Sequence, residues 1–85
     1  MAYSYATMKE KTLTDEGVNA LFAIRDRAHK LIDFAGACRY EVMLKGIHIS
    51  DNWLALACVD RLVEMGEIKE VVIPGVPTQW RIFVK

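Results

Sequence analysis

The fold is decided by residues 50–73, which read SDNWLALACVDRLVEMGEIKEVVI. Ser50 is a strong helix N-cap candidate, and Gly66 is a common residue just past a helix end. Between them, apolar residues recur at helical spacing and predict one buried stripe, made of Leu54, Cys58, Leu62 and Met65. After Gly66 the period changes, and residues 68–73 are rich in β-branched side chains. This stretch therefore predicts a helix that leads directly into a strand.

Two further helices are predicted upstream of this stretch. Thr14 or Asp15 should cap a long helix that runs to about Ala35 and stops at Gly36. Its expected inner stripe is Val18, Leu21, Ala28, Ile32 and Ala35. A short second helix should cover residues 39–44 and break at residues 45–46.

Downstream, residues 74–77 (PGVP) cannot continue a strand and should form a turn. Residues 78–84 are predicted to return as a second strand with two alternating faces. Trp80, Ile82 and Val84 are expected on the buried face, and Gln79, Arg81 and Phe83 on the outer face. Residues 1–12 lack a helical period and are expected to be a loosely ordered arm, or an arm that reaches a partner, ahead of a domain covering residues 13–85.

Composition narrows the class of protein. The 85 residues are 53% apolar, which suits a small globular domain, and 11 basic residues balance 11 acidic ones. We expect a cytoplasmic protein, because the sequence has neither a signal peptide nor a run of apolar residues long enough to span a membrane. Cys38 and Cys58 are expected to be buried free thiols.

Enzymatic chemistry is not expected. His29 and His48 lie far apart in the sequence, with no carboxylate or cysteine at the spacing of metal ligands. Neither cysteine has an activating base close to it in the sequence. We therefore predict no catalytic residue, no metal and no cofactor.

The order of the expected elements resembles the winged helix-turn-helix superfamily, in particular bacterial and phage regulators. The resembling residues are Ile49-Ser50 at the start of a helix, residues 62–68 (LVEMGEI), and residues 79–83 (QWRIF) at the end of a hairpin. The resemblance covers about residues 14–85. It implies an α+β fold of three helices closed by a C-terminal two-stranded hairpin, the wing.

The resemblance also implies a regulator of transcription that binds double-stranded DNA through the third helix. The wing and the turn before that helix would add contacts to the phosphates and base edges. The implied DNA-binding residues are Arg39, Lys45, His48, Ser50, Asn52, Lys69, Thr78, Gln79 and Arg81.

The outer face of the predicted third helix departs from this pattern. It carries aromatic, aliphatic and acidic side chains, namely Trp53, Leu56, Asp60 and Glu64. Carboxylates repel phosphates, so we expect DNA binding to be weak, non-specific or assisted by a homodimer. The alternative is a winged-helix module that binds a protein partner through these same four residues.

Overall fold

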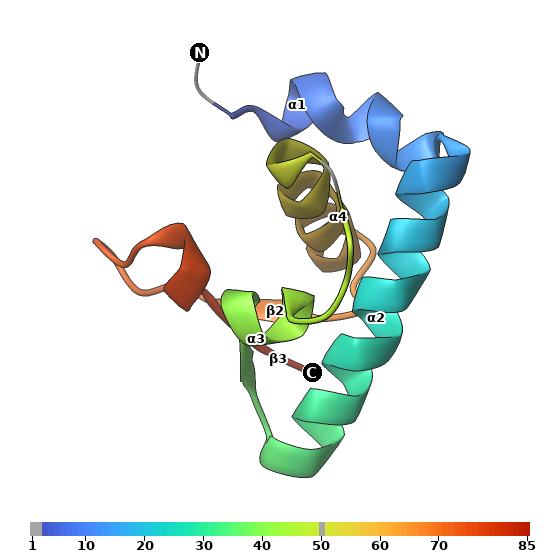
Figure 1. Ribbon diagram of the computed structural model, residues 1–85. Helices are drawn as coiled ribbons and strands as arrows, with labels where there is room; N and C mark the ends of the chain where they lie inside the picture. Colours follow the sequence, from blue (N-terminus) through green and yellow to red (C-terminus); the bar gives the residue numbers. More distant parts are fainter. Residues whose placement is uncertain (1–2, 50) are drawn as a thin grey trace.

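The computed structural model describes residues 3–49 and 51–85 (Figure 1). Its longest element is helix α2, Asp15–Ala35, which begins and ends where the sequence predicts. The Thr14 hydroxyl accepts a hydrogen bond from the backbone N–H of Gly17 at 3.1 Å, and Gly36 ends the helix with a φ of 85°. Of the predicted inner stripe, Leu21, Ala28 and Ile32 are buried, whereas Val18 is half-buried and Ala35 is exposed.

Residues 5–13 are helical, so the prediction of a loosely ordered arm is wrong for residues 5–12. Helix α1, Tyr5–Met8, continues into the 3-10 helix η1, Lys9–Leu13. Both pack on α4, Asn52–Glu64, and η1 also packs on α2 (Figure 1). Met8 and Thr12 are buried there, so each of the two short helices contributes one buried side chain.

The close packing of η1 on α2 depends on Gly17. A Cβ atom at this position would lie 2.6 Å from the Cα of Thr12 and even closer to the carbonyl oxygen of Lys11. The backbone of η1 therefore occupies the volume that any other side chain would need.

Helix α4 supplies the centre of the core. Its N-cap is Asp51, whose carboxylate accepts a hydrogen bond from the backbone N–H of Trp53 at 2.9 Å. Ser50, the predicted cap, lies outside the described residues. The predicted stripe is buried except at Met65, which is exposed because the helix ends at Glu64 and the chain turns away. Cys58 in this stripe and Cys38 are buried free thiols, as predicted.

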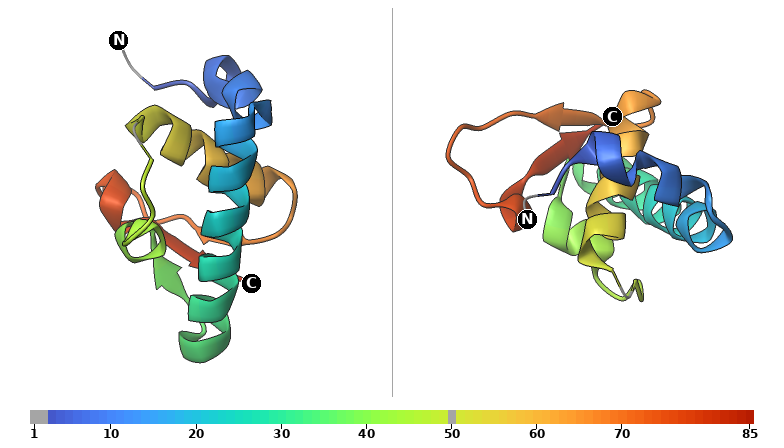
Figure 2. Two further views of the ribbon diagram at one scale, coloured as in Figure 1. Left: turned by 45° about the vertical axis from the view of Figure 1, so that its right-hand side comes forward. Right: turned by 90° about the horizontal axis from the view of Figure 1, so that it is seen from above.

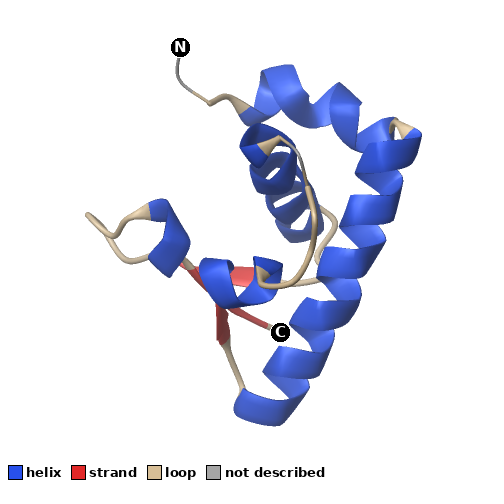
Figure 3. Ribbon diagram, viewed as in Figure 1, coloured by secondary structure: helices blue, strands red, loops and turns tan. Residues whose placement is uncertain are grey.

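The sheet has one more strand than the sequence predicts. Strands β1 (Cys38–Arg39), β2 (Lys69–Val71) and β3 (Ile82–Val84) form an antiparallel sheet in the order β1-β3-β2 (Figure 3). Cys38 pairs with Phe83, and Ile82 pairs with both Arg39 and Val71. The short strand β1 leads directly into helix α3, Tyr40–Leu44, close to the predicted second helix. The protein is therefore an α+β fold.

The predicted faces of the returning strand are reversed. Phe83 is fully buried and faces the helices beside Cys38, whereas Trp80 is 52% exposed. The physical reason is that residues 78–80 form a 3-10 helix, η2, so strand alternation begins only at Ile82. The loop and η2 project from the helical body, as the view from above shows (Figure 2).

Candidate interaction site

The N-terminal segment covers much of the outer face of α4, the face that carries Trp53, Leu56, Asp60 and Glu64. The hydroxyl of Tyr3 donates a hydrogen bond to Asp60 Oδ2 at 2.6 Å, and the Tyr3 ring meets the Trp53 ring edge-on at 6.5 Å between centroids. Trp53 and Asp60 are therefore already engaged within the chain.

Glu64 is held in the same way at the next turn of α4. Its Oε1 accepts a hydrogen bond from the Tyr5 hydroxyl at 3.1 Å and lies 2.8 Å from Lys9 Nζ. The hydrogen bond with Lys9 holds the pKa of Glu64 below its ordinary value, and burial raises the pKa of Tyr5 to about 12. A charged carboxylate beside a neutral phenol is the state that these contacts favour.

Arg81 points inward, which corrects the expectation that it lies on the outer face of the hairpin. Its guanidinium lies 2.7 Å from Glu70 Oε1 and 2.8 Å from Asp60 Oδ1, and its side chain is only 20% exposed. The hydrogen bonds to Glu70 raise its pKa above the ordinary value. Two carboxylates thus neutralise the cation that was expected to contact DNA.

Three of the predicted DNA-binding residues meet at one place. Asn52 at the start of α4 and Thr78 and Gln79 of η2 line a hollow of about 230 Å³ together with Leu56 and two residues of α3. The structure therefore brings together the two segments, helix start and hairpin, that the resemblance implies.

The remaining basic residues that were predicted to bind DNA lie outside this hollow. Arg39 and Lys45 line a separate hollow, where Arg39 pairs with Glu41 at 3.4 Å. His48 is exposed in the loop before α4, and Lys69 is exposed on β2. Phosphate contacts from these positions would be few, which limits the electrostatic attraction to DNA.

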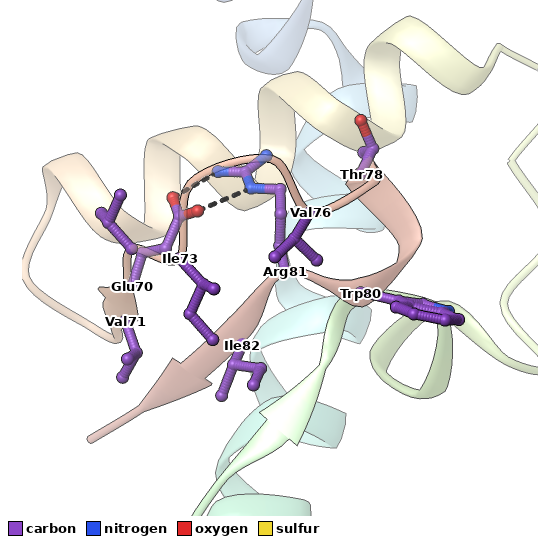
Figure 4. Close-up of a pocket in the computed structure, with 9 residues that line it drawn as sticks. Glu70, Val71, Ile73, Val76, Thr78, Trp80, Arg81 and Ile82 are labelled. Atoms are coloured by element: carbon purple, nitrogen blue, oxygen red, sulfur yellow. Dashed lines mark hydrogen bonds and ion pairs between the residues drawn. The ribbon is translucent and has the colours of Figure 1, made fainter.

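The hairpin carries four exposed large apolar side chains, a surface that sequence reasoning missed. Val72 is 78% exposed, and Val71, Ile73 and Trp80 are also exposed. Figure 4 shows Val71, Ile73 and Ile82 pointing to the same side, while Trp80 lies apart beside α3. The signal was present in residues 71–73 (VVI), because three consecutive apolar residues must leave one face of a hairpin uncovered.

Comparisons with protein-family models, curated proteins and solved structures found no match. Function is therefore inferred from the chain's own geometry. Within residues 3–49 and 51–85, each helix is too short or too polar to cross a membrane. The same ranges contain no group of three or more histidine, cysteine or acidic side chains placed to hold a metal ion.

Proposed function

We propose that this chain is a winged-helix module that binds a protein partner through its hairpin. The winged-helix assignment is supported by the element order α2, β1, α3, α4, β2, β3 and by the strand order β1-β3-β2. In a winged helix with these elements, β2 and β3 flank the wing and α4 is the third helix. Helices α1 and η1 are then an N-terminal addition that covers α4.

The observation that carries the proposal is the apolar, unpaired edge of the hairpin. Strand β2 is the last strand of the sheet, so its outer edge carries no further strand in the part of the chain that the structure describes. Val71 ends this strand and Ile73 follows it, and both are exposed and also line a hollow of about 200 Å³ between the two arms of the hairpin. Exposed apolar edges are sites where another chain can pair.

The occupant we propose is an extended segment of a partner protein that adds to β2 as a fourth strand. Backbone hydrogen bonds would supply the affinity of such a complex, and alternate side chains of the segment would contact Val71 and Ile73. The charge pattern favours an uncharged or mildly acidic segment, because Lys69 is exposed on β2 while Glu70 is occupied by Arg81.

DNA binding remains as a second candidate, favoured by one observation. Asn52, Thr78 and Gln79 converge on the hollow at the start of α4. Amide and hydroxyl groups at such a place suit contacts with base edges and phosphates. This mode would insert only the first turn of α4, since the N-terminal segment occupies the face beyond it.

A selection from a library of random displayed peptides, using the purified chain as bait, tests the primary proposal. We expect enriched peptides with alternating apolar residues and no proline. Their affinity should fall at least about tenfold with the double change Val71→Asp and Ile73→Asp, because both contact side chains are lost. Phe22→Asp is the matched control, since Phe22 is also 47% exposed, like Ile73, but lies on α2.

The same variants and two further single variants, Asn52→Ala and Gln79→Ala, are then each titrated with a mixed-sequence DNA duplex at several salt concentrations. Weak binding with little salt dependence agrees with the protein-binding proposal. That proposal would be refuted if the peptides bound the Val71→Asp, Ile73→Asp double variant with the same affinity as the natural chain. Salt-dependent duplex binding that Asn52→Ala and Gln79→Ala abolish would establish the second candidate instead.

A further inference from the structure

The pairing of β3 fixes which backbone groups point to each side of that strand. On the β1 side, the backbone N–H of Tyr40 donates to the carbonyl oxygen of Arg81 at 2.8 Å, and Cys38 lies opposite Phe83. Hydrogen-bonded pairs in an antiparallel ladder recur at every second residue, so Phe83 also directs its N–H and C=O groups toward β1. Ile82 must then direct its own backbone groups to the other side, toward β2.

The same alternation identifies the backbone groups at the free edge of β2. Val71 lies opposite Ile82, so its N–H and C=O groups face β3. Glu70 and Val72, on either side of Val71, direct theirs to the outer edge of the sheet. The next residue of this set is Pro74, which has no N–H to donate. Since β2 begins one residue before Glu70, this edge offers a partner strand two pairing positions, Glu70 and Val72.

Three side chains alternate with these pairing positions on one face of β2. They belong to Lys69, Val71 and Ile73, and Figure 4 shows Val71 and Ile73 pointing to the same side. All three residues are exposed. Opposite residues that exchange no backbone hydrogen bonds approach most closely, to about 4.5 Å between Cα atoms. The partner side chains opposite these three residues therefore make the closest contacts of such a complex.

Lys69 is the one charged side chain in this row, and its charge is not neutralised within the chain. The two acids nearest to it in the sequence are engaged elsewhere, Glu70 by Arg81 at 2.7 Å and Glu67 by His29 at 3.2 Å. Within residues 3–49 and 51–85, the ammonium group of Lys69 forms no ion pair or side-chain hydrogen bond. An unpaired cation on an edge strand disfavours segments that cannot neutralise it.

We propose that the partner strand runs antiparallel to β2, with an acidic side chain opposite Lys69 and apolar side chains opposite Val71 and Ile73. From its N-terminus, such a segment has two apolar residues separated by one residue, and then an aspartate or glutamate two residues after the second. The antiparallel direction is favoured because it is the more stable pairing per residue and this edge is short. Lys69 thereby selects among the apolar segments that the proposed function admits, and this assignment rests on that function.

A peptide selection on three forms of the chain tests the role of Lys69. A random displayed library is selected on the natural chain, on Lys69→Glu and on Lys30→Glu, which makes the same charge change at an exposed position of α2. The natural chain and Lys30→Glu should both enrich the pattern with an acidic residue. Lys69→Glu should enrich lysine or arginine at that position instead. Circular dichroism should show all three forms folded, since both lysines are exposed.

One peptide enriched on the natural chain is then titrated at low salt beside a variant with lysine in place of its acidic residue. The natural chain should prefer the acidic peptide at least about threefold, and Lys69→Glu should reverse the preference, as a double-mutant cycle requires for opposed charges. Enriched peptides that need Val71 and Ile73 but lack a fixed acidic position, or carry it before the apolar pair, would overturn the inference and leave the proposed function standing. Enriched peptides that bind independently of Val71 and Ile73 would overturn both.

Discussion

The N-terminal segment and the C-terminal hairpin both carry aromatic side chains, yet the tyrosines of the N-terminal segment pack on α4, whereas Trp80 of the hairpin is exposed. Tyr3 and Tyr5 place their rings on α4 and their hydroxyls on its carboxylates. Val72 and Trp80 on the hairpin project into solvent. The difference shows that an amphipathic aromatic is satisfied where a helix offers both an apolar surface and an acceptor, whereas aliphatic residues on a projecting loop find neither.

The strongest test of this difference lies within the hairpin itself. Phe83→Ala should destabilise the protein by about 3–5 kcal/mol, because it leaves a cavity at a fully buried site. Trp80→Ala should cost about 1 kcal/mol, because half of that ring is already exposed. Urea denaturation followed by circular dichroism measures both. Equal losses would mean that Trp80 is as deeply buried as Phe83.

The anchoring of the N-terminal segment is tested at Gly17. Gly17→Ala should cost about 1–3 kcal/mol, since the added methyl group must displace the backbone of Lys11 and Thr12. Asn19→Ala, at an exposed position of the same helix, should change the free energy of unfolding by no more than about 0.5 kcal/mol. If both variants unfold at the same urea concentration, η1 does not pack on α2 as described.

The smallest expected effect concerns the contact between Tyr3 and Asp60. Tyr3→Phe removes one part-buried hydrogen bond and should cost about 0.5–1.5 kcal/mol. Tyr5→Phe should cost less, because its bond to Glu64 is longer and exposed. Thermal unfolding of the two variants under identical conditions gives the order. A larger loss for Tyr5→Phe would mean that the segment is attached mainly through Glu64 and not through Asp60.

The local parts of the fold were predictable from sequence. The Thr14 cap, the Gly36 stop and the buried stripe of α4 follow from chemistry within a few residues of each position. Strand β1 was not predictable, because two residues carry no periodicity and pair only with a strand that arrives more than forty residues later. The reversed faces of β3 have a similar origin, since η2 shifts the alternation by a turn that the sequence pattern does not reveal.

The candidate site was predicted less well than the fold. The outer face of α4 was identified correctly as aromatic and acidic, but the sequence did not indicate that Tyr3 and Tyr5 cover it. Arg81 was expected outside for the same reason, since its acceptors come from α4 and β2 and meet only in the folded chain. Sequence patterns indicate which faces exist, whereas long-range contacts decide which of them stay free.

Asp60 joins the two ends of the molecule. One of its carboxylate oxygens accepts the hydrogen bond from Tyr3, and the other accepts the hydrogen bond from Arg81. The two contacts share one side chain on α4, so their energies are coupled rather than independent. This coupling is reciprocal. A ligand that draws Arg81 away from Asp60 would change the strength of the contact between Tyr3 and Asp60, and loss of the Tyr3 contact would change the strength of the Arg81 contact by the same free energy. A single carboxylate thus couples the attachment of Tyr3 to that of Arg81.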